Sequence, residues 1–194
     1  MKRVQILTFA LAFVFFSIQA QQLEKIELED ITMSASFKLK DHQKDKALVL
    51  IFTSNDCPYA KLYEDRIIQL QKQFGDKGIT FALVNPYAGQ SEEESLNQIK
   101  SKISQKNIAF SYLSDPNQLL TKQLKVTKVP EAFVLIPSPT GFGIAYHGAI
   151  DNNPQAPQSV TKNHLEIALN QILKKENPMP TFVRAIGCNV KVLN

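Results

Sequence analysis

The feature that most constrains the fold is a continuous apolar run that ends close to a Cys-Pro pair. Residues 46–54 read KALVLIFTS, and Cys57 and Pro58 follow after Asn-Asp. A β-branched and aromatic run without polar alternation is typical of a strand that is covered on both faces. Proline is favoured in the first turn of a helix, and apolar residues recur at helical spacing up to Phe74. The sequence therefore predicts a buried strand, a cysteine at the turn and a helix.

The rest of the chain alternates between strand-like and helix-like segments. Hydrophobic periodicity and turn residues predict a short edge strand at 34–41, further strands at 79–86, 109–115, 131–137 and 141–150, and helices at 91–107, 116–126 and 159–175. The helix at 91–107 is expected to begin with a Ser cap, to carry its acids in the first turn and to bury Leu96. Strands that alternate with helices, followed by a hairpin and a closing helix, indicate one α/β domain with a mixed sheet between helices.

The first residues have the layout of a secretory signal peptide. Lys2 and Arg3 precede an apolar run from Val4 to Ile18, which is shorter than the roughly 20 apolar residues that a spanning helix needs. We therefore expect residues 1–20 to be a signal peptide cleaved after Ala20. The mature protein is then exported, to a periplasm or to the outside of the cell, with no stable membrane span.

The remaining chain divides into three parts. We expect a polar lead-in at 21–33, the α/β domain at 34–175 and a tail without clear periodicity at 176–194. Without Lys2 and Arg3 the chain keeps 20 basic and 18 acidic residues, a net charge of about +2, with the two signs interleaved. No basic, aromatic-rich stripe is present, so the sequence does not favour a nucleic-acid partner.

Cys57 is the residue most suited to chemistry. It ends a buried strand and directly precedes a helix, where unpaired backbone N–H groups and the helix dipole stabilise an anion. A thiolate at such a position has a lowered pKa and attacks more readily near neutral pH, provided that solvent can reach it. The alternative is a buried cysteine that serves only as a small hydrophobic side chain.

These elements resemble a known family. The Cys-Pro turn, a strand that ends in VNP, an inserted helix, SYLSDPNQLL and VTKVPEAFVL before a hairpin and a helix are similar to the thioredoxin fold. The likeness is greatest to its redoxin branch, meaning proteins related to alkyl hydroperoxide reductase and thiol-specific antioxidant and exported thioredoxin-like proteins. The resemblance covers residues 34–175 and implies a three-layer α/β/α domain. It also implies a cis bond between Val129 and Pro130, which places a backbone edge beside Cys57 for a partner chain.

The sequence departs from both redoxin site patterns. Thioredoxins have a second cysteine where this chain has Ala60, and a buried acid where it has Ile51. Peroxiredoxins have a proline where this chain has Leu50, although Ser54 matches their hydroxyl position. They also need a nearby arginine, and after the signal peptide the chain has only Arg66 and Arg184. Thiol–disulfide exchange with a protein partner and reduction of a peroxide both remain open.

Cys188 is the only other cysteine. It lies 131 residues after Cys57 in the tail, which can fold back over the sheet edge and bring the two thiols together. The GCNVK segment at 187–191 resembles the ends of related exported redoxins. A bond between Cys57 and Cys188 would supply the resolving thiol or would only hold the tail; the sequence leaves both open.

Other functions have less support. The three histidines, His42, His147 and His164, have no metal-ligand spacing from one another or from the cysteines, so we predict neither a metal nor a cofactor. The polar loop at 151–158 is expected to have no role. A binding module with a fixed disulfide is the alternative to an enzyme, and Ala60 favours it.

Overall fold

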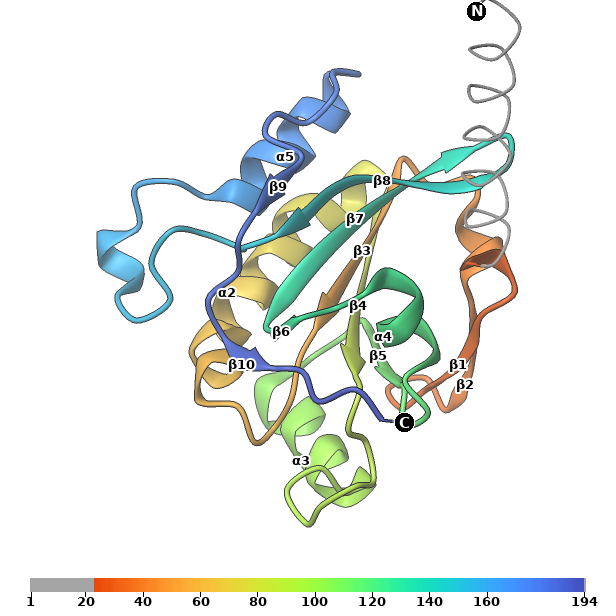
Figure 1. Ribbon diagram of the computed structural model, residues 1–194, viewed down its shortest axis with the longest axis vertical. Coiled ribbons are helices and arrows are strands. Elements are labelled where there is room, and N and C mark those ends of the chain that lie inside the picture. The colour runs from red at the N-terminus through yellow and green to blue at the C-terminus, as the bar shows by residue number, and fades with distance from the viewer. Residues whose placement is uncertain (1–22, 194) are drawn as a thin grey trace, which may run out of the picture.

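The structure is a computed structural model that describes residues 23–193 (Figure 1). The expectations for residues 1–20, including cleavage at Ala20, lie outside the described residues. Within the part described, no helix is both long and apolar enough to cross a membrane.

The predicted buried strand is β3 (Ala47–Phe52), and all six of its residues are buried. Successive side chains of a strand point to opposite faces. Val49 and Ile51 accordingly belong to one hydrophobic core, whereas Leu48, Leu50 and Phe52 belong to the other. The apolar run is therefore continuous because the strand is covered on both sides.

Eight strands of the described chain form one mixed sheet in the order β2-β1-β5-β4-β3-β7-β8-β9. β3 and β5 each run parallel to β4, which lies between them, whereas β7 pairs antiparallel with β3 and forms the predicted antiparallel hairpin with β8. The remaining bounds are β1 (Glu27–Asp30), β2 (Ala35–Lys38), β4 (Ile79–Asn85), β5 (Ser111–Ser114), β7 (Glu131–Ser138), β8 (Gly141–Gly148) and β9 (Phe182–Val183).

Helices cover both faces of this sheet, as predicted. One core takes buried side chains from α2 (Pro58–Phe74), α3 (Leu96–Lys106) and α5 (His164–Leu173). The opposite core takes Leu120 and Leu124 from α4 (Leu119–Leu124) together with Cys57. Short 3-10 turns lie at Leu39–His42, Gly75–Lys77 and Pro157–Ser159. The α/β class and the layered architecture are thus confirmed, with a thinner layer on the α4 side.

One strand was not predicted, and one predicted helix is misplaced. The polar lead-in contains β1, which pairs antiparallel with both β2 and β5. The helix predicted at 91–107 begins later: Ser95 is the N-cap, accepting a hydrogen bond from the backbone N–H of Gln98, and Leu96 is exposed. The acids at 92–94 therefore precede α3, and Glu94 is buried.

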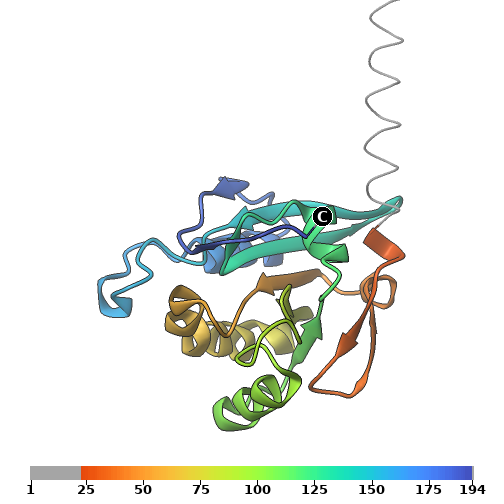
Figure 2. The same ribbon diagram turned by 60° about the horizontal axis from the view of Figure 1, so that its bottom comes forward.

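The tail is an integral part of the fold. Its strand β9 adds to the edge of the sheet by parallel pairing with β8. The chain then crosses to β6 (Lys128–Val129), where β10 (Cys188–Asn189) pairs antiparallel with it in a separate two-stranded sheet. Figures 1 and 2 both show the chain ending beside α4. The tail expected to be aperiodic thus connects three separate parts of the domain.

Candidate active site

Cys57 is the N-cap residue of α2. Its backbone is extended, its carbonyl accepts a hydrogen bond from the N–H of Lys61, and Pro58 occupies the first helical position. The first turn of the helix carries no acidic residue, so no carboxylate on α2 competes for its free N–H groups. A thiolate at Cys57 in the reduced protein would lie at the positive end of the helix dipole.

Cys57 and Cys188 form a disulfide, with their Cα atoms 6.0 Å apart. The bond closes a loop of 131 residues, and in the chain-entropy model a loop of that size stabilises the fold by about 4–5 kcal/mol. The two cysteines that the sequence leaves as a candidate pair are therefore joined, and the tail is held at the N-terminus of α2.

The sulfur of Cys57 is not open to solvent in this oxidised state. Cys57 is only 2% exposed and belongs to a hydrophobic cluster that includes Val126 and Val129. Cys188 and Val190 of the tail pack against the same cluster. The expectation of a solvent-accessible sulfur is therefore wrong for the disulfide form, and the tail contributes to the cover.

The bond between Val129 and Pro130 is cis, as the resemblance implies. The carbonyl oxygen of Val129 lies 3.1 Å from the sulfur of Cys57. That sulfur carries no proton in the disulfide, so the contact becomes a hydrogen bond only when Cys57 is a thiol. The edge beside Pro130 thus adjoins the sulfur of Cys57 directly.

A buried carboxylate, which the sequence analysis missed, shapes this edge. Glu131 is buried, and its Oε2 accepts hydrogen bonds from the backbone N–H groups of Thr127 and Lys128, at 3.0 and 3.1 Å, and from the hydroxyl of Thr127 at 3.3 Å. The carboxylate of Glu131 thereby holds the residues that precede Pro130, while the backbone of β6 pairs with β10.

A family model described as AhpC/TSA family matches residues 18–152, which is more than half of the chain. The chain belongs to the AhpC/TSA family. This is the redoxin family that the sequence resembles, and the match includes Cys57 and Pro130 but stops before Cys188. A comparison with curated proteins found no match.

Solved structures place this AhpC/TSA protein in the thioredoxin fold. A hypothetical protein from Sinorhizobium meliloti is 26% identical, with a TM-score of 0.75 over 84% of this chain and 88% of that one. A secreted disulfide oxidoreductase of Mycobacterium tuberculosis, homologous to E. coli DsbE, is 18% identical, with a TM-score of 0.52 over 70% of this chain and 87% of that one. Peroxiredoxin Q of Xanthomonas campestris is 16% identical, with a TM-score of 0.52 over 64% and 80%. At these identities the last two show the fold alone.

Ser54, the residue at the peroxiredoxin hydroxyl position, is buried and already bonded. Its hydroxyl donates to Oε1 of Glu94 at 2.5 Å, and the same carboxylate oxygen accepts the backbone N–H of Asp56 at 3.0 Å. The other oxygen of Glu94 accepts from the side-chain amide of Asn85 at 2.7 Å. Glu94 thus fixes the loop that leads into Cys57. Glu94 falls inside the helix predicted at 91–107, in its expected first turn, so the sequence carries no local sign of this role.

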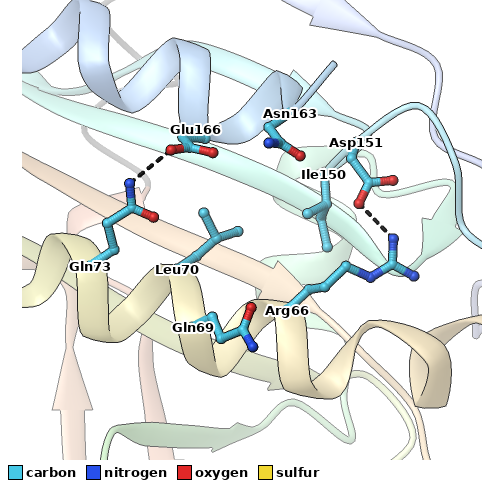
Figure 3. A pocket seen from close by; sticks show the side chains of 8 residues that line it. All are labelled: Arg66, Gln69, Leu70, Gln73, Ile150, Asp151, Asn163 and Glu166. Carbon is cyan, nitrogen blue, oxygen red and sulfur yellow. Dashed lines mark hydrogen bonds and ion pairs between the residues drawn. The ribbon is translucent and has the colours of Figure 1, made fainter. Parts of the chain in front are cut away.

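Arg66, one of two arginines available to polarise a peroxide, is bound elsewhere (Figure 3). Its guanidinium forms an ion pair with buried Asp151 at 2.6 Å and donates to the carbonyls of Asn153 and Pro154. The hydroxyl of Tyr63 donates to the same carboxylate at 2.7 Å. Burial, with Asp151 adding to the effect, raises the pKa of Tyr63 above its usual range. The loop at 151–158 therefore anchors to α2 through Asp151, a structural role that we did not predict.

A surface pocket between α2 and α5 shares no residue with the disulfide site. Figure 3 shows Leu70 and Gln73 of α2 pointing toward Glu166 of α5, with a hydrogen bond of 2.8 Å from Gln73 to Glu166. Among its polar groups, Gln73 is paired with Glu166 and Arg66 with Asp151.

His147 lies beside the site edge in an aromatic stack. Its ring packs between Phe133 and Phe182, and its Nδ1 lies 3.7 Å from a carboxylate oxygen of Glu131. No group of three or more His, Cys, Asp or Glu residues within 23–193 is arranged to hold a metal ion. His147 therefore packs β9 against the sheet.

Proposed function

We propose that this AhpC/TSA family protein is an exported thiol–disulfide oxidoreductase that uses Cys57 as its nucleophile and Cys188 as its resolving thiol. The observation that carries the proposal is the disulfide at the N-terminus of α2, directly beside the backbone edge that precedes Pro130. The proposed domain is 34–175 with a signal peptide at 1–20, and the tail at 176–194 supplies the second cysteine.

The reaction begins from the dithiol. The Cys57 thiolate attacks one sulfur of a partner disulfide, which forms a mixed disulfide and releases one partner thiolate. The Cys188 thiolate then attacks the sulfur of Cys57, which forms the observed disulfide and releases the second partner thiolate. Two electrons pass from this protein to the partner, and a dithiol reductant must restore the starting state.

The surroundings of Cys57 suit this chemistry. The helix N-terminus stabilises the thiolate both as nucleophile and as leaving group, and a thiol of lower pKa leaves faster. Val129 and Pro130 shape the groove in which the partner's backbone lies. The second thiol, missing at Ala60, comes from the tail.

A peroxidase is the second candidate, because the matched family includes thiol-specific antioxidant proteins. The Cys57 thiolate would attack one oxygen of a peroxide, which breaks the O–O bond, gives a sulfenic acid and releases the other oxygen as an alcohol or water; Cys188 would then condense with the sulfenic acid and release water. The bonds of Ser54 to Glu94 and of Arg66 to Asp151 oppose this candidate, since neither side chain is free to polarise a peroxide. Fast, stoichiometric sulfenate formation with dilute peroxide would favour the peroxidase.

A non-catalytic module with a permanent disulfide is the third candidate, favoured by the burial of Cys57. It predicts a disulfide that ordinary cellular reductants do not open.

The test is reduction of a protein disulfide, such as that of insulin, with dithiothreitol as electron donor. We expect Cys57→Ser to reduce the rate to that of dithiothreitol alone and Cys188→Ser to accumulate a mixed disulfide with the partner at Cys57. Undiminished activity of folded Cys57→Ser protein would refute the assignment. Mass analysis of the exported protein would test cleavage after Ala20.

A further inference from the structure

We propose that residues 187–193 occupy the partner groove as a built-in substitute for a partner segment, and that the groove selects extended segments in which glycine precedes the reacting cysteine. The proposal rests on the proposed function, because it names the partner segment that Cys57 attacks. The segment 187–193 is called the plug below.

The plug binds as an added strand. Cys188 is paired with Val129 and Asn189 with Lys128, and the N–H of Val190 donates to the carbonyl of Thr127 at 3.0 Å. In the described chain β6 has no strand partner other than β10. The edge beside Pro130 is therefore filled by the protein's own tail, in the extended conformation that a peptide strand adopts at a sheet edge.

Beyond Val190, three further hydrogen bonds hold the backbone of the plug. The side-chain amide of Gln118 donates to the carbonyl of Lys191 at 2.9 Å and accepts from the N–H of Leu193 at 2.8 Å. The hydroxyl of Tyr87 accepts from the N–H of Lys191 at 2.8 Å. These hydrogen bonds involve only backbone atoms of the plug, so any extended segment can form them. Gln118 is fully buried. Its NH2 group also donates to the carbonyl of Pro86 at 3.4 Å, but without the plug its side-chain carbonyl would lose the N–H of Leu193, and an unpaired buried acceptor is costly. An emptied groove therefore favours a new occupant.

At two positions of the plug, 187 and 190, the groove restricts which side chain can fit. A Cβ on Gly187 would lie 2.3 Å from the carbonyl oxygen of Val129 and 2.7 Å from its carbonyl carbon, so only glycine fits without a shift of backbone. Val190 packs against the cluster that contains Cys57 and Val126. Asn189 is exposed, and its side chain accepts a hydrogen bond from the ammonium group of Lys128. Lys191, Val192 and Leu193 are exposed as well. The groove therefore selects glycine before the cysteine and an aliphatic residue two positions after it.

Plug and partner cannot bind together, since both need the same edge of β6 and the same sulfur. In the oxidised protein the disulfide keeps the plug in place, and reduction leaves only the noncovalent contacts. A partner segment then competes with the plug for the groove.

The experiment uses the Cys188→Ser protein, in which Cys57 is free and the plug is present without its disulfide. The probe is a peptide with the sequence of residues 186–192, its cysteine activated as a disulfide with thionitrobenzoate. Attack by Cys57 on the peptide sulfur forms a mixed disulfide and releases the coloured thionitrobenzoate anion, whose appearance gives the rate. A matched peptide has alanine in place of the glycine.

We expect the glycine peptide to react at least tenfold faster than the alanine peptide. Adding Gly187→Ala to the Cys188→Ser protein dislodges the plug and should accelerate the glycine peptide several-fold. The control is Gly143→Ala, where a Cβ meets only ordinary contact at 3.9 Å, and there the rate should not change. Equal rates for the two peptides, or no acceleration by Gly187→Ala, would overturn the proposal.

A small disulfide, 5,5′-dithiobis(2-nitrobenzoate), separates this proposal from the proposed function. If Cys57 reacts with this reagent but does not distinguish the peptides, only the groove preference fails. If Cys57 reacts with neither reagent nor peptide, the proposed function fails and the groove preference with it.

Discussion

Cys188 lies opposite Val129 in the antiparallel pairing of β6 and β10, and its sulfur is at the same time bonded to Cys57. One residue thus joins the redox state of the site to the occupancy of its groove. Backbone hydrogen bonds position the tail on the domain, and the disulfide adds a covalent link. This arrangement is expected if the disulfide opens during function.

Tyr87→Phe should loosen the tail without disturbing the domain. The substitution removes the hydroxyl that accepts the N–H of Lys191, and one such hydrogen bond contributes about 1 kcal/mol. We expect amide hydrogen exchange at Lys191 in the oxidised protein to become roughly fivefold faster. The control is Tyr59→Phe, which removes a hydroxyl that does not bond to the tail, and it should leave the exchange rate of Lys191 unchanged. Equal exchange in both variants would mean that the contact contributes nothing.

Glu94→Gln should destabilise the loop before Cys57. The buried carboxylate accepts from Ser54, from the N–H of Asp56 and from Asn85, and an amide cannot accept at both ends. Leaving one buried donor unpaired costs about 1–3 kcal/mol, which urea denaturation of the oxidised protein would detect.

The control for the Glu94 substitution is its exposed neighbour Glu92. Glu92→Gln should change the free energy of unfolding by less than about 0.5 kcal/mol, as is usual at the surface. A Glu94→Gln protein as stable as this control would contradict the role given to Glu94.

Asp115 should make stability depend on pH. Its carboxylate accepts from the N–H of Leu119 and from both the N–H and the hydroxyl of Thr121, yet burial dominates and raises its pKa above the ordinary value of 3.8. Between pH 3.8 and the higher folded-state pKa, the folded protein therefore holds a proton on Asp115 that the unfolded chain has lost. The contribution of Asp115 to the free energy of unfolding falls as pH rises through this window.

The variant Asp115→Asn cannot titrate and isolates this effect. We expect the stability of the wild type minus that of Asp115→Asn, from denaturant titrations at a series of pH values, to decrease across that window. A difference that grows with rising pH would show that the hydrogen bonds outweigh burial.

The sequence predicts those parts of the fold that depend on local pattern. The double-sided burial of β3 is readable in its unbroken apolar run, and Pro58 places the start of α2 correctly. β1 escaped prediction because its sequence, ELED, looks polar. It is a strand because its backbone pairs with two neighbours and because buried Asp30 accepts the N–H groups of Thr32 and Tyr112.

The candidate site is only partly predictable for the same reason. Cys57, Pro130 and Cys188 are marked by residue type and position along the chain. Glu94, Gln118 and Tyr87 owe their roles to donors and acceptors that are distant in sequence, and no local pattern signals such contacts.

The central claim is that the bond between Cys57 and Cys188 opens and closes in function, and its reduction potential tests this most directly. Equilibration of the full-length oxidised protein with defined dithiothreitol ratios, followed by alkylation and mass spectrometry, gives the fraction reduced. We expect a potential in the range of thiol–disulfide exchange proteins, about −120 to −270 mV. A value below about −300 mV, typical of structural disulfides, would contradict it.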